Sequence, residues 1–88
     1  MVEVVSLGEG SMVSPTHQLD VIGFFCPVPV AEAKKALSNM DVGQILEVLA
    51  DDPETVYDMP LLTARGKNLI LSIEEKAGEL RFLIEVIE

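Results

Sequence analysis

The chain has 88 residues, of which 49% are hydrophobic and 24% are charged, a composition typical of one small folded domain. Its formal net charge of −9 argues against binding to nucleic-acid backbones and to anionic membrane surfaces, both of which attract basic proteins. No run of about eighteen apolar residues occurs, so we expect no membrane-spanning helix. The N-terminus does not have the pattern of a secretory signal, and the expected location is the cytosol.

The chain has a single cysteine, Cys26, and a single histidine, His17. One cysteine can form neither an internal disulfide nor a Cys-x-x-Cys redox pair, and one histidine beside it cannot complete a tetrahedral zinc site. We therefore expect no metal ion and no cofactor. Any thiol chemistry has to run through Cys26.

Residues 1–16 are predicted to be an N-terminal extension, and residues 17–88 to be the folded domain. Residues 2–7 include strand-forming side chains, but residues 8–11 interrupt them with two glycines and a serine. We expect the extension to be partly disordered or to pair loosely at a sheet edge.

The domain is predicted to begin with a strand over residues 17–22 that ends at Gly23. A helix is predicted over residues 30–40, where one apolar stripe recurs at helical spacing. Gly43 lies close to the position where a helix ends. The stripe consists of Val30, Ala33, Leu37 and Met40.

A second strand is predicted over residues 44–50, which are nearly apolar on both faces and therefore suit the centre of a sheet. An irregular turn should follow as far as Tyr57. A second helix is predicted from Asp58 to Arg65, because Pro60 suits a first helical turn and Gly66 suits its end.

A hairpin is predicted over residues 68–75 and 79–87, around the turn Ala77-Gly78. Leu83 and Ile87 should point away from the helices, so the outer face of the sheet is half apolar, and a homodimer or a docking surface there is an open alternative. Two alternating rows should face the helices: Leu69, Leu71 and Ile73 on one strand, and Leu80, Phe82, Ile84 and Val86 on the other.

The predicted order is β-α-β-α-β-β. Strand–helix–strand units of this length cross over with a right hand, and two crossovers in the same direction place both helices on one face. The predicted fold is a two-layer α/β (α+β) sandwich, with a mixed four-stranded sheet and two helices on one face.

Cys26 lies between the end of the first predicted strand and the start of the first helix. Open α/β sheets tend to have their functional sites at this end of the strands. Pro27 is expected at the first helical position, and Pro29 inside the first turn. The amides of Val28 and Val30 should then face the sulfur. A helix N-terminus lowers the pKa of a thiol, so the pattern predicts a reactive thiolate.

A lone cysteine beside Phe24 and Phe25 also suits a small buried hydrophobic residue. His17 is expected at the surface, because the length of the strand separates it from Cys26. Other charged residues have alternative interpretations. The lysines at positions 34 and 35 should form a solvated face, although they and Arg65 could instead approach the thiol. The aspartates at positions 51, 52 and 58 are expected to cap helix starts, and the alternatives are a metal site or an acid–base pair.

Residues 17–87 resemble the TusA/SirA family of sulfur carriers. The Cys-Pro-x-Pro element at the first helix start is specific, and the Asp-Asp-Pro and Asp-x-Pro elements lie at matching distances from it. The residues that carry the resemblance are Leu19-Asp20, Gly23, Cys26-Pro27-x-Pro29, Lys34, Asn39-Met40, Gly43, Val48-x-Ala50-Asp51-Asp52-Pro53, Asp58-Met59-Pro60 and Gly66.

This resemblance implies that Cys26 accepts sulfane sulfur as a persulfide from a cysteine desulfurase or a rhodanese-like protein and passes it to an acceptor protein. The chain would then be a sulfurtransferase of the carrier type. Two other functions stay open at this point: a regulatory or protein-interaction module without catalysis, and a selenium or thiol-redox accessory that uses the same cysteine.

Overall fold

The computed structural model describes residues 4–6, 15–63 and 66–88. Its helices and strands follow the predicted order, with one additional short strand at the N-terminal end. The elements are β1 (Val4–Ser6), β2 (His17–Asp20), α1 (Val28–Ser38), β3 (Ile45–Ala50), α2 (Thr55–Asp58), the 3-10 helix η1 (Met59–Thr63), β4 (Asn68–Lys76) and β5 (Glu79–Val86).

The strands form one mixed sheet with the order β1-β2-β3-β5-β4. Strands β2 and β3 are parallel, whereas β5 is antiparallel to both β3 and β4, so that β4 runs in the same direction as β3. The predicted four-stranded mixed sheet is confirmed for β2 to β5. Strand β1 adds a fifth, antiparallel strand at the β2 edge, and the other residues of the predicted extension up to position 14 lie outside the described residues.

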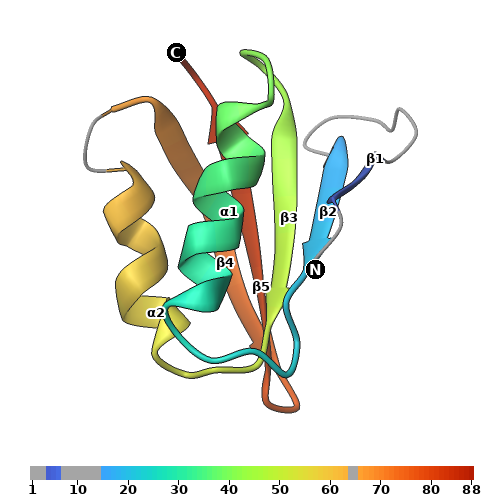
Figure 1. Cartoon of the computed structure of the whole chain (residues 1–88), viewed down its shortest axis with the longest axis vertical. Coiled ribbons are helices and arrows are strands. Elements are labelled where there is room, and N and C mark those ends of the chain that lie inside the picture. Colours follow the sequence, from blue (N-terminus) through green and yellow to red (C-terminus); the bar gives the residue numbers. More distant parts are fainter. Residues whose placement is uncertain (1–3, 7–14, 64–65) are drawn as a thin grey trace.

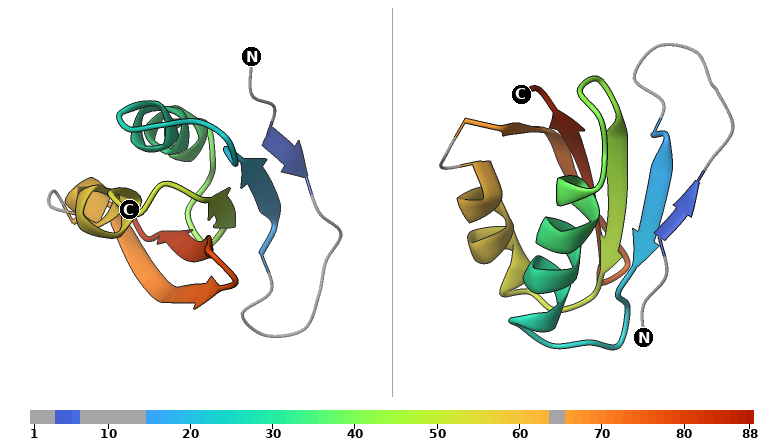
Figure 2. Two further views of the ribbon diagram at one scale, coloured as in Figure 1. Left: turned by 90° about the horizontal axis from the view of Figure 1, so that it is seen from below. Right: turned by 45° about the horizontal axis from the view of Figure 1, so that its top comes forward.

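Both helical segments lie on the same face of the sheet, as predicted (Figures 1 and 2). Helix α1 connects the parallel strands β2 and β3, and the α2–η1 segment connects β3 to β4. The opposite face of the sheet carries no helix in the described part of the chain. No helix among the described residues is both long and apolar enough to cross a bilayer.

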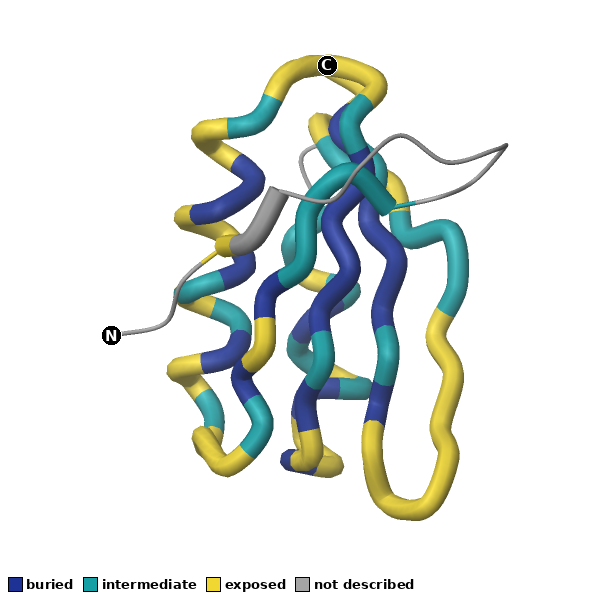
Figure 3. Tube along the Cα trace, turned by 90° about the vertical axis from the view of Figure 1, so that its right-hand side faces the viewer, coloured by how far each residue is buried: buried dark blue, intermediate teal, exposed yellow. Residues whose placement is uncertain are grey.

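The core lies between the sheet and the two helical segments. Strands β3 and β5 are the most continuously buried strands, and each helix buries the side that faces them (Figure 3). The predicted inward row of β5 is confirmed. The buried core side chains are Leu19, Val21, Ala33, Ala36, Leu37, Leu46, Val48, Ala50, Met59, Leu80, Phe82, Ile84 and Val86.

The predicted inward row of β4 is wrong at Leu69, which pairs with Glu85 and is 47% exposed, while its neighbour Ile70 packs against the core. It is borne out at Ile73, which pairs with the core residue Phe82 although it is itself 41% exposed at the sheet edge. The pairing of β4 with β5 shifts register between Ile70 and Ser72. One extra residue in a strand reverses the face that the following side chains occupy. A prediction of strict alternation along β4 therefore cannot hold on both sides of the shift.

The outer face of the sheet carries an ionic network as well as apolar side chains. The buried carboxylate of Glu47 accepts hydrogen bonds from Gln18, at 2.6 Å, and from Arg81, which also bonds Glu74 at 2.8 Å. Burial alone would raise the pKa of Glu47, but these hydrogen bonds and the charge of Arg81 outweigh it, and the pKa lies below its usual value. Of the two apolar residues predicted for this face, Leu83 is buried and Ile87 is exposed.

Helix α2 begins earlier than predicted, whereas α1 begins one residue after Pro27, the predicted first helical position. Helix α1 starts at Val28, with Pro27 as the capping residue rather than the first helical residue. The α-helical turn α2 starts at Thr55, and only residues from Met59 on, including Pro60, form a separate 3-10 segment. Proline lacks an N–H and disfavours a continuous α-helix, which explains the change to 3-10 geometry at this point.

The β4–β5 hairpin is confirmed and closes through Ala77 and Gly78, which have φ angles of 53° and 83°. Two consecutive residues with positive φ match the right-handed twist of the paired strands. Arg65, the predicted last residue of the second helix, lies outside the described residues.

Replacement of Phe82 by alanine should destabilise the fold by about 3–5 kcal/mol, because its side chain is fully buried in the core. The same replacement at Phe25, which is 77% exposed, should change the free energy of unfolding by less than about 0.5 kcal/mol. Urea unfolding of the two variants measures both values. Equal losses at the two positions would contradict the described core.

Candidate functional site

The loop that carries Cys26 runs from the carboxyl end of β2 to the start of α1. It lies beside the segment that follows β3, because β2 and β3 are parallel and their carboxyl ends meet at one edge of the sheet (Figure 1). This edge is the expected position of a site in an open α/β sheet. The predicted placement of Cys26 is therefore confirmed by the fold.

Two aspartates that follow β3 hold this loop by its backbone. The N–H of Gly23 donates to Oδ1 of Asp51 at 2.9 Å, and the N–H of Cys26 donates to Oδ2 of Asp52 at 2.7 Å. Gly23 has a φ of 90°, which places it in the left-handed region that favours glycine. The position of the Cys26 backbone thus depends on residues 26 positions further along the chain.

Asp52 also organises the start of α2. Its Oδ1 accepts the N–H of Glu54 at 3.1 Å, and its backbone carbonyl accepts both the N–H and the hydroxyl of Thr55, at 3.0 and 2.6 Å. Asp52 thus lies just before the helix start, as predicted, but Glu54 is the N-cap residue of α2 and no side chain in the described part of the chain forms a cap hydrogen bond there. The same buried carboxylate binds Cys26, a contact that the sequence did not predict.

The other two aspartates do not cap helices. Asp51 binds the loop at Gly23, and Asp58 is the last residue of α2 because that helix begins at Thr55. The thiol of Cys26 donates a hydrogen bond to Oδ2 of Asp58 at 2.9 Å. The capping role predicted for Asp51 and Asp58 is therefore wrong, and the structure places Asp58 beside the sulfur.

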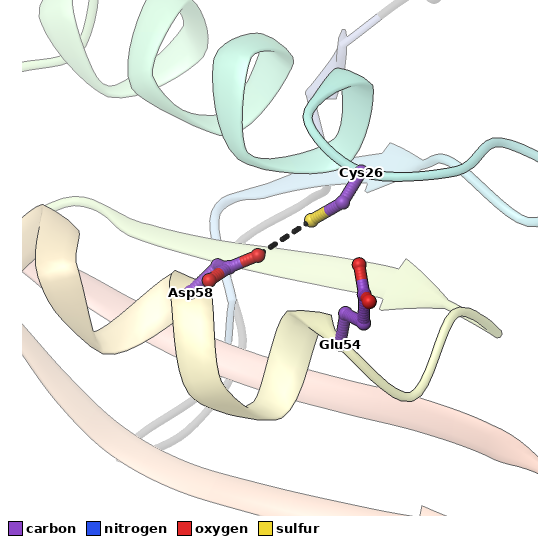
Figure 4. Close-up of side chains that lie close together, drawn as sticks. All are labelled: Cys26, Glu54 and Asp58. Atoms are coloured by element: carbon purple, nitrogen blue, oxygen red, sulfur yellow. Dashed lines mark hydrogen bonds between the residues drawn. The ribbon is translucent and has the colours of Figure 1, made fainter.

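Three side chains meet at the half-buried sulfur. The carboxylates of Glu54 and Asp58 both project toward the loop that carries Cys26 (Figure 4). One ligand atom from each of these three residues lies within 4.8 Å of the others. Sulfur and carboxylate oxygen donors at such distances could hold a divalent cation such as zinc. In the structure the thiol proton, donated to Asp58, links the two side chains.

The carboxylates raise the pKa of the Cys26 thiol to about 11. The largest cause is the hydrogen bond to Asp58, followed by partial burial and by the negative charges of Asp58, Asp52 and Glu54. A helix N-terminus provides only about half a positive charge, which these full charges outweigh. The prediction of a lowered thiol pKa is therefore wrong.

The amides near the sulfur offer less compensation than the sequence indicated. The N–H of Val28 is already bonded to the carbonyl of Phe25 at 2.9 Å, because Pro27 caps the helix and Cys26 lies one residue outside it. Lys34 and Lys35 are exposed on α1, and the groups that shift the pKa of Cys26 are carboxylates.

His17 does not serve the thiol. It lies at the beginning of β2, whereas Cys26 lies beyond its end, and its Nδ1 is 2.9 Å from the hydroxyl of Thr16. The predicted separation of the two residues is confirmed.

Exposed apolar side chains lie on the two segments that form the site. Phe25 precedes the cysteine, while Tyr57 and Leu61 are 79% and 68% exposed on the α2–η1 segment. Four residues recur at helical spacing and therefore share one side of the α2–η1 segment: Glu54, Tyr57, Asp58 and Leu61. Glu54, Tyr57 and Leu61 were not predicted as site residues, because their spacing becomes a detectable signal only once the helix start at Thr55 is known.

Residues 17–86 match the family described as sulfurtransferase TusA. The chain is 40% identical to a candidate sulfur carrier protein of Archaeoglobus fulgidus over 72 residues, which cover 81% of this chain and 94% of that protein. It is 38% identical to the sulfur carrier protein TusA of Allochromatium vinosum over 69 residues, which cover 78% of this chain and 91% of that protein.

A solved structure agrees with these sequence matches. The crystal structure of a SirA-like protein from Desulfitobacterium hafniense superposes with a TM-score of 0.70 at 27% sequence identity. The match covers 81% of this chain and 97% of that protein.

Replacement of Asp58 by asparagine should lower the pKa of Cys26 from about 11 toward the ordinary 9.0 of a cysteine thiol, because it removes the charge that holds the proton. The rate of iodoacetamide alkylation, measured against pH, should show a midpoint at lower pH. Below that midpoint the rate should rise by roughly tenfold for each unit of the shift. The control is Asp41→Asn, the same change beyond the other end of α1, and a shift of equal size there would contradict the assignment.

Replacement of Asp52 by alanine should cost about 1–3 kcal/mol of stability, because the N–H groups of Cys26 and Glu54 lose their acceptor. Glu54→Ala, at an exposed side chain, should cost less than about 0.5 kcal/mol. Urea unfolding distinguishes the two variants. An Asp52→Ala protein as stable as wild type would show that this carboxylate does not hold the loop.

Proposed function

Because the chain belongs to the TusA family of sulfurtransferases and is a sulfur carrier, we propose that Cys26 is the residue that carries the sulfur, as a persulfide. One observation carries the proposal: the only thiol of the chain lies half-exposed at the carboxyl edge of the sheet. A persulfide requires a cysteine sulfur that another protein can reach. Cys26 meets this requirement.

The transfer that we propose is a thiolate–persulfide exchange. The thiolate of Cys26 attacks the terminal sulfur of a donor persulfide, R–S–SH; a new S–S bond forms, and the donor's S–S bond breaks. The electron pair of the broken bond leaves on the donor cysteine, which takes up the proton that Cys26 releases. No external oxidant or reductant is needed, and an acceptor thiolate takes the sulfur by the same exchange.

Asp58 is a positioning residue in this scheme. Its hydrogen bond fixes the direction of the Cys26 side chain and keeps the thiol protonated in the free protein.

We propose that the chain acts as a carrier and not as a multi-turnover enzyme by itself. One thiol holds one sulfur, so turnover requires a donor protein, such as a cysteine desulfurase or a rhodanese-like protein, and an acceptor protein. The cytosolic location expected from the sequence stays a prediction.

Incubation of the reduced protein with a cysteine desulfurase and cysteine should add the mass of one sulfur atom, which dithiothreitol should remove. Cys26→Ser, which replaces the sulfur by oxygen in a side chain of similar shape, should remain unmodified. Intact-mass spectrometry measures both. Inorganic polysulfide is the second donor, because it needs no protein docking.

An adduct on Cys26→Ser would show that the sulfur sits elsewhere. Failure of the wild-type protein to load from either donor would contradict the proposal that Cys26 carries persulfide sulfur.

A further inference from the structure

The two segments that meet at the sulfur carry both acidic and exposed apolar side chains. Asp51 and Glu54 are exposed and Asp58 is half-buried, and all three lie along the edge that carries Cys26. The apolar members are Phe25, Tyr57 and Leu61. We call these six residues the acidic docking surface.

This surface creates a difficulty for the free protein. With a pKa of about 11, the thiol of Cys26 is ionised in only about one molecule in ten thousand at neutral pH. The thiolate is the nucleophile in sulfur exchange, so the unbound protein should react more slowly than one whose thiol has an ordinary pKa. A positive charge on a partner protein would favour ionisation of the Cys26 thiol.

We propose that the acidic docking surface binds a partner protein with a basic patch, and that an arginine or lysine of this partner pairs with Asp58 and Glu54 and so releases the Cys26 thiolate inside the complex. The proposal deepens the function proposed above and rests on Cys26 as the sulfur-bearing residue.

Charge complementarity supports a basic protein as the occupant. Among the described residues, the ion pairs are those that Arg81 makes with Glu47 and Glu74 on the outer sheet face, and none involves the carboxylates at Cys26. A second copy of this chain would bring its own carboxylates against them, which costs energy. Nucleic acids and anionic membranes would be repelled for the same reason.

A guanidinium suits the geometry of the site. It donates two parallel hydrogen bonds to a carboxylate, so it would compete with the thiol for Asp58, whose Oδ2 now accepts the Cys26 proton. It would also cancel the negative charges that disfavour the thiolate. A partner cation therefore removes both the hydrogen bond and the charge repulsion that raise the pKa.

The apolar members supply the contact area around this charge pair. Interfaces typically place aromatic side chains and arginine at their centre, surrounded by residues that exclude water. Tyr57 and Leu61 lie beside Asp58 on the α2–η1 segment, and Phe25 lies next to the cysteine on the loop. Exclusion of water would strengthen the pairing of Asp58 with the partner cation.

The test uses three short disulfide-bonded peptide dimers of equal length as probes. In the first, arginine and phenylalanine flank the cysteine; in the second, arginine and serine; in the third, glutamate and phenylalanine. Thiolate attack by Cys26 on each disulfide gives a mixed disulfide, which mass spectrometry follows over time. At low salt the arginine–phenylalanine probe should react at least about tenfold faster than the glutamate–phenylalanine probe, because each close charge pair alters the rate severalfold.

Matched variants test whether these particular carboxylates are responsible. The variant Asp51→Asn/Glu54→Gln/Asp58→Asn should reduce the ratio of the two rates to about twofold. Asp41→Asn/Glu85→Gln/Glu88→Gln makes the same charge change at the opposite end of the domain and should preserve the ratio. Equal rates for the two probes, or equal ratios in the two triple variants, would overturn the proposal.

The apolar half of the surface has its own variant. Tyr57→Ser/Leu61→Ser should slow the arginine–phenylalanine probe by about threefold and leave the arginine–serine probe unchanged. Equal slowing of both probes would overturn the role of these side chains. Circular dichroism checks the fold, and the single variant Glu54→Gln, at an exposed side chain, replaces the triple variant if that one unfolds.

The outcome is separable from that of the proposed function. If the rate ratios hold but Cys26 gains no sulfur from a desulfurase or from polysulfide, the docking surface stands and the carrier site is wrong. If sulfur loads but the charge of the probe has no effect, the carrier site stands and the docking surface is wrong.

Discussion

The buried carboxylate of Asp52 is the constraint on which the site depends. It accepts the backbone N–H of Cys26 with one oxygen and the N–H of Glu54 with the other, so one side chain joins the β2–α1 loop to the start of α2. The acceptor can reach both because β2 and β3 are parallel neighbours whose ends meet. Sheet topology, loop conformation and the place of the sulfur are therefore linked.

A consequence of this arrangement is that negative charge gathers where the thiol lies. Asp52 brings α2 toward the loop, and α2 carries Glu54 and Asp58 on the side that faces Cys26 (Figure 4). The contact that orders the loop therefore also delivers the carboxylates that raise the pKa of the thiol. Local order and low intrinsic reactivity have a common structural cause.

The sequence correctly predicted features that depend on residues close to one another in the chain. The position of Cys26 between strand and helix, the hairpin at Ala77-Gly78 and the inward row of β5 all follow from spacing and turn chemistry. The alternation of β4 was predicted correctly at Ile73 and incorrectly at Leu69, because the register shift after Ile70 becomes visible only when β5 is paired beside it.

The electrostatics of the site could not be predicted from neighbours in the chain. The helix N-terminus and its amides lie near Cys26 in sequence, whereas Asp58 lies 32 positions away and comes into contact only through the fold. Its full charge, at hydrogen-bond distance, outweighs a partial helix charge. The position of Cys26 in the fold was predicted correctly, and the direction of its pKa shift was predicted incorrectly.

A protonated thiol in the free protein has a chemical advantage for a carrier. Small electrophiles and oxidants react with thiolates, so a thiol held by Asp58 is protected from them until a partner arrives. In the persulfide that we propose for Cys26, the terminal sulfur would be one bond further from the backbone than the Sγ atom that Asp58 now contacts. Asp58 would therefore restrain the unloaded thiol more directly than the loaded sulfur.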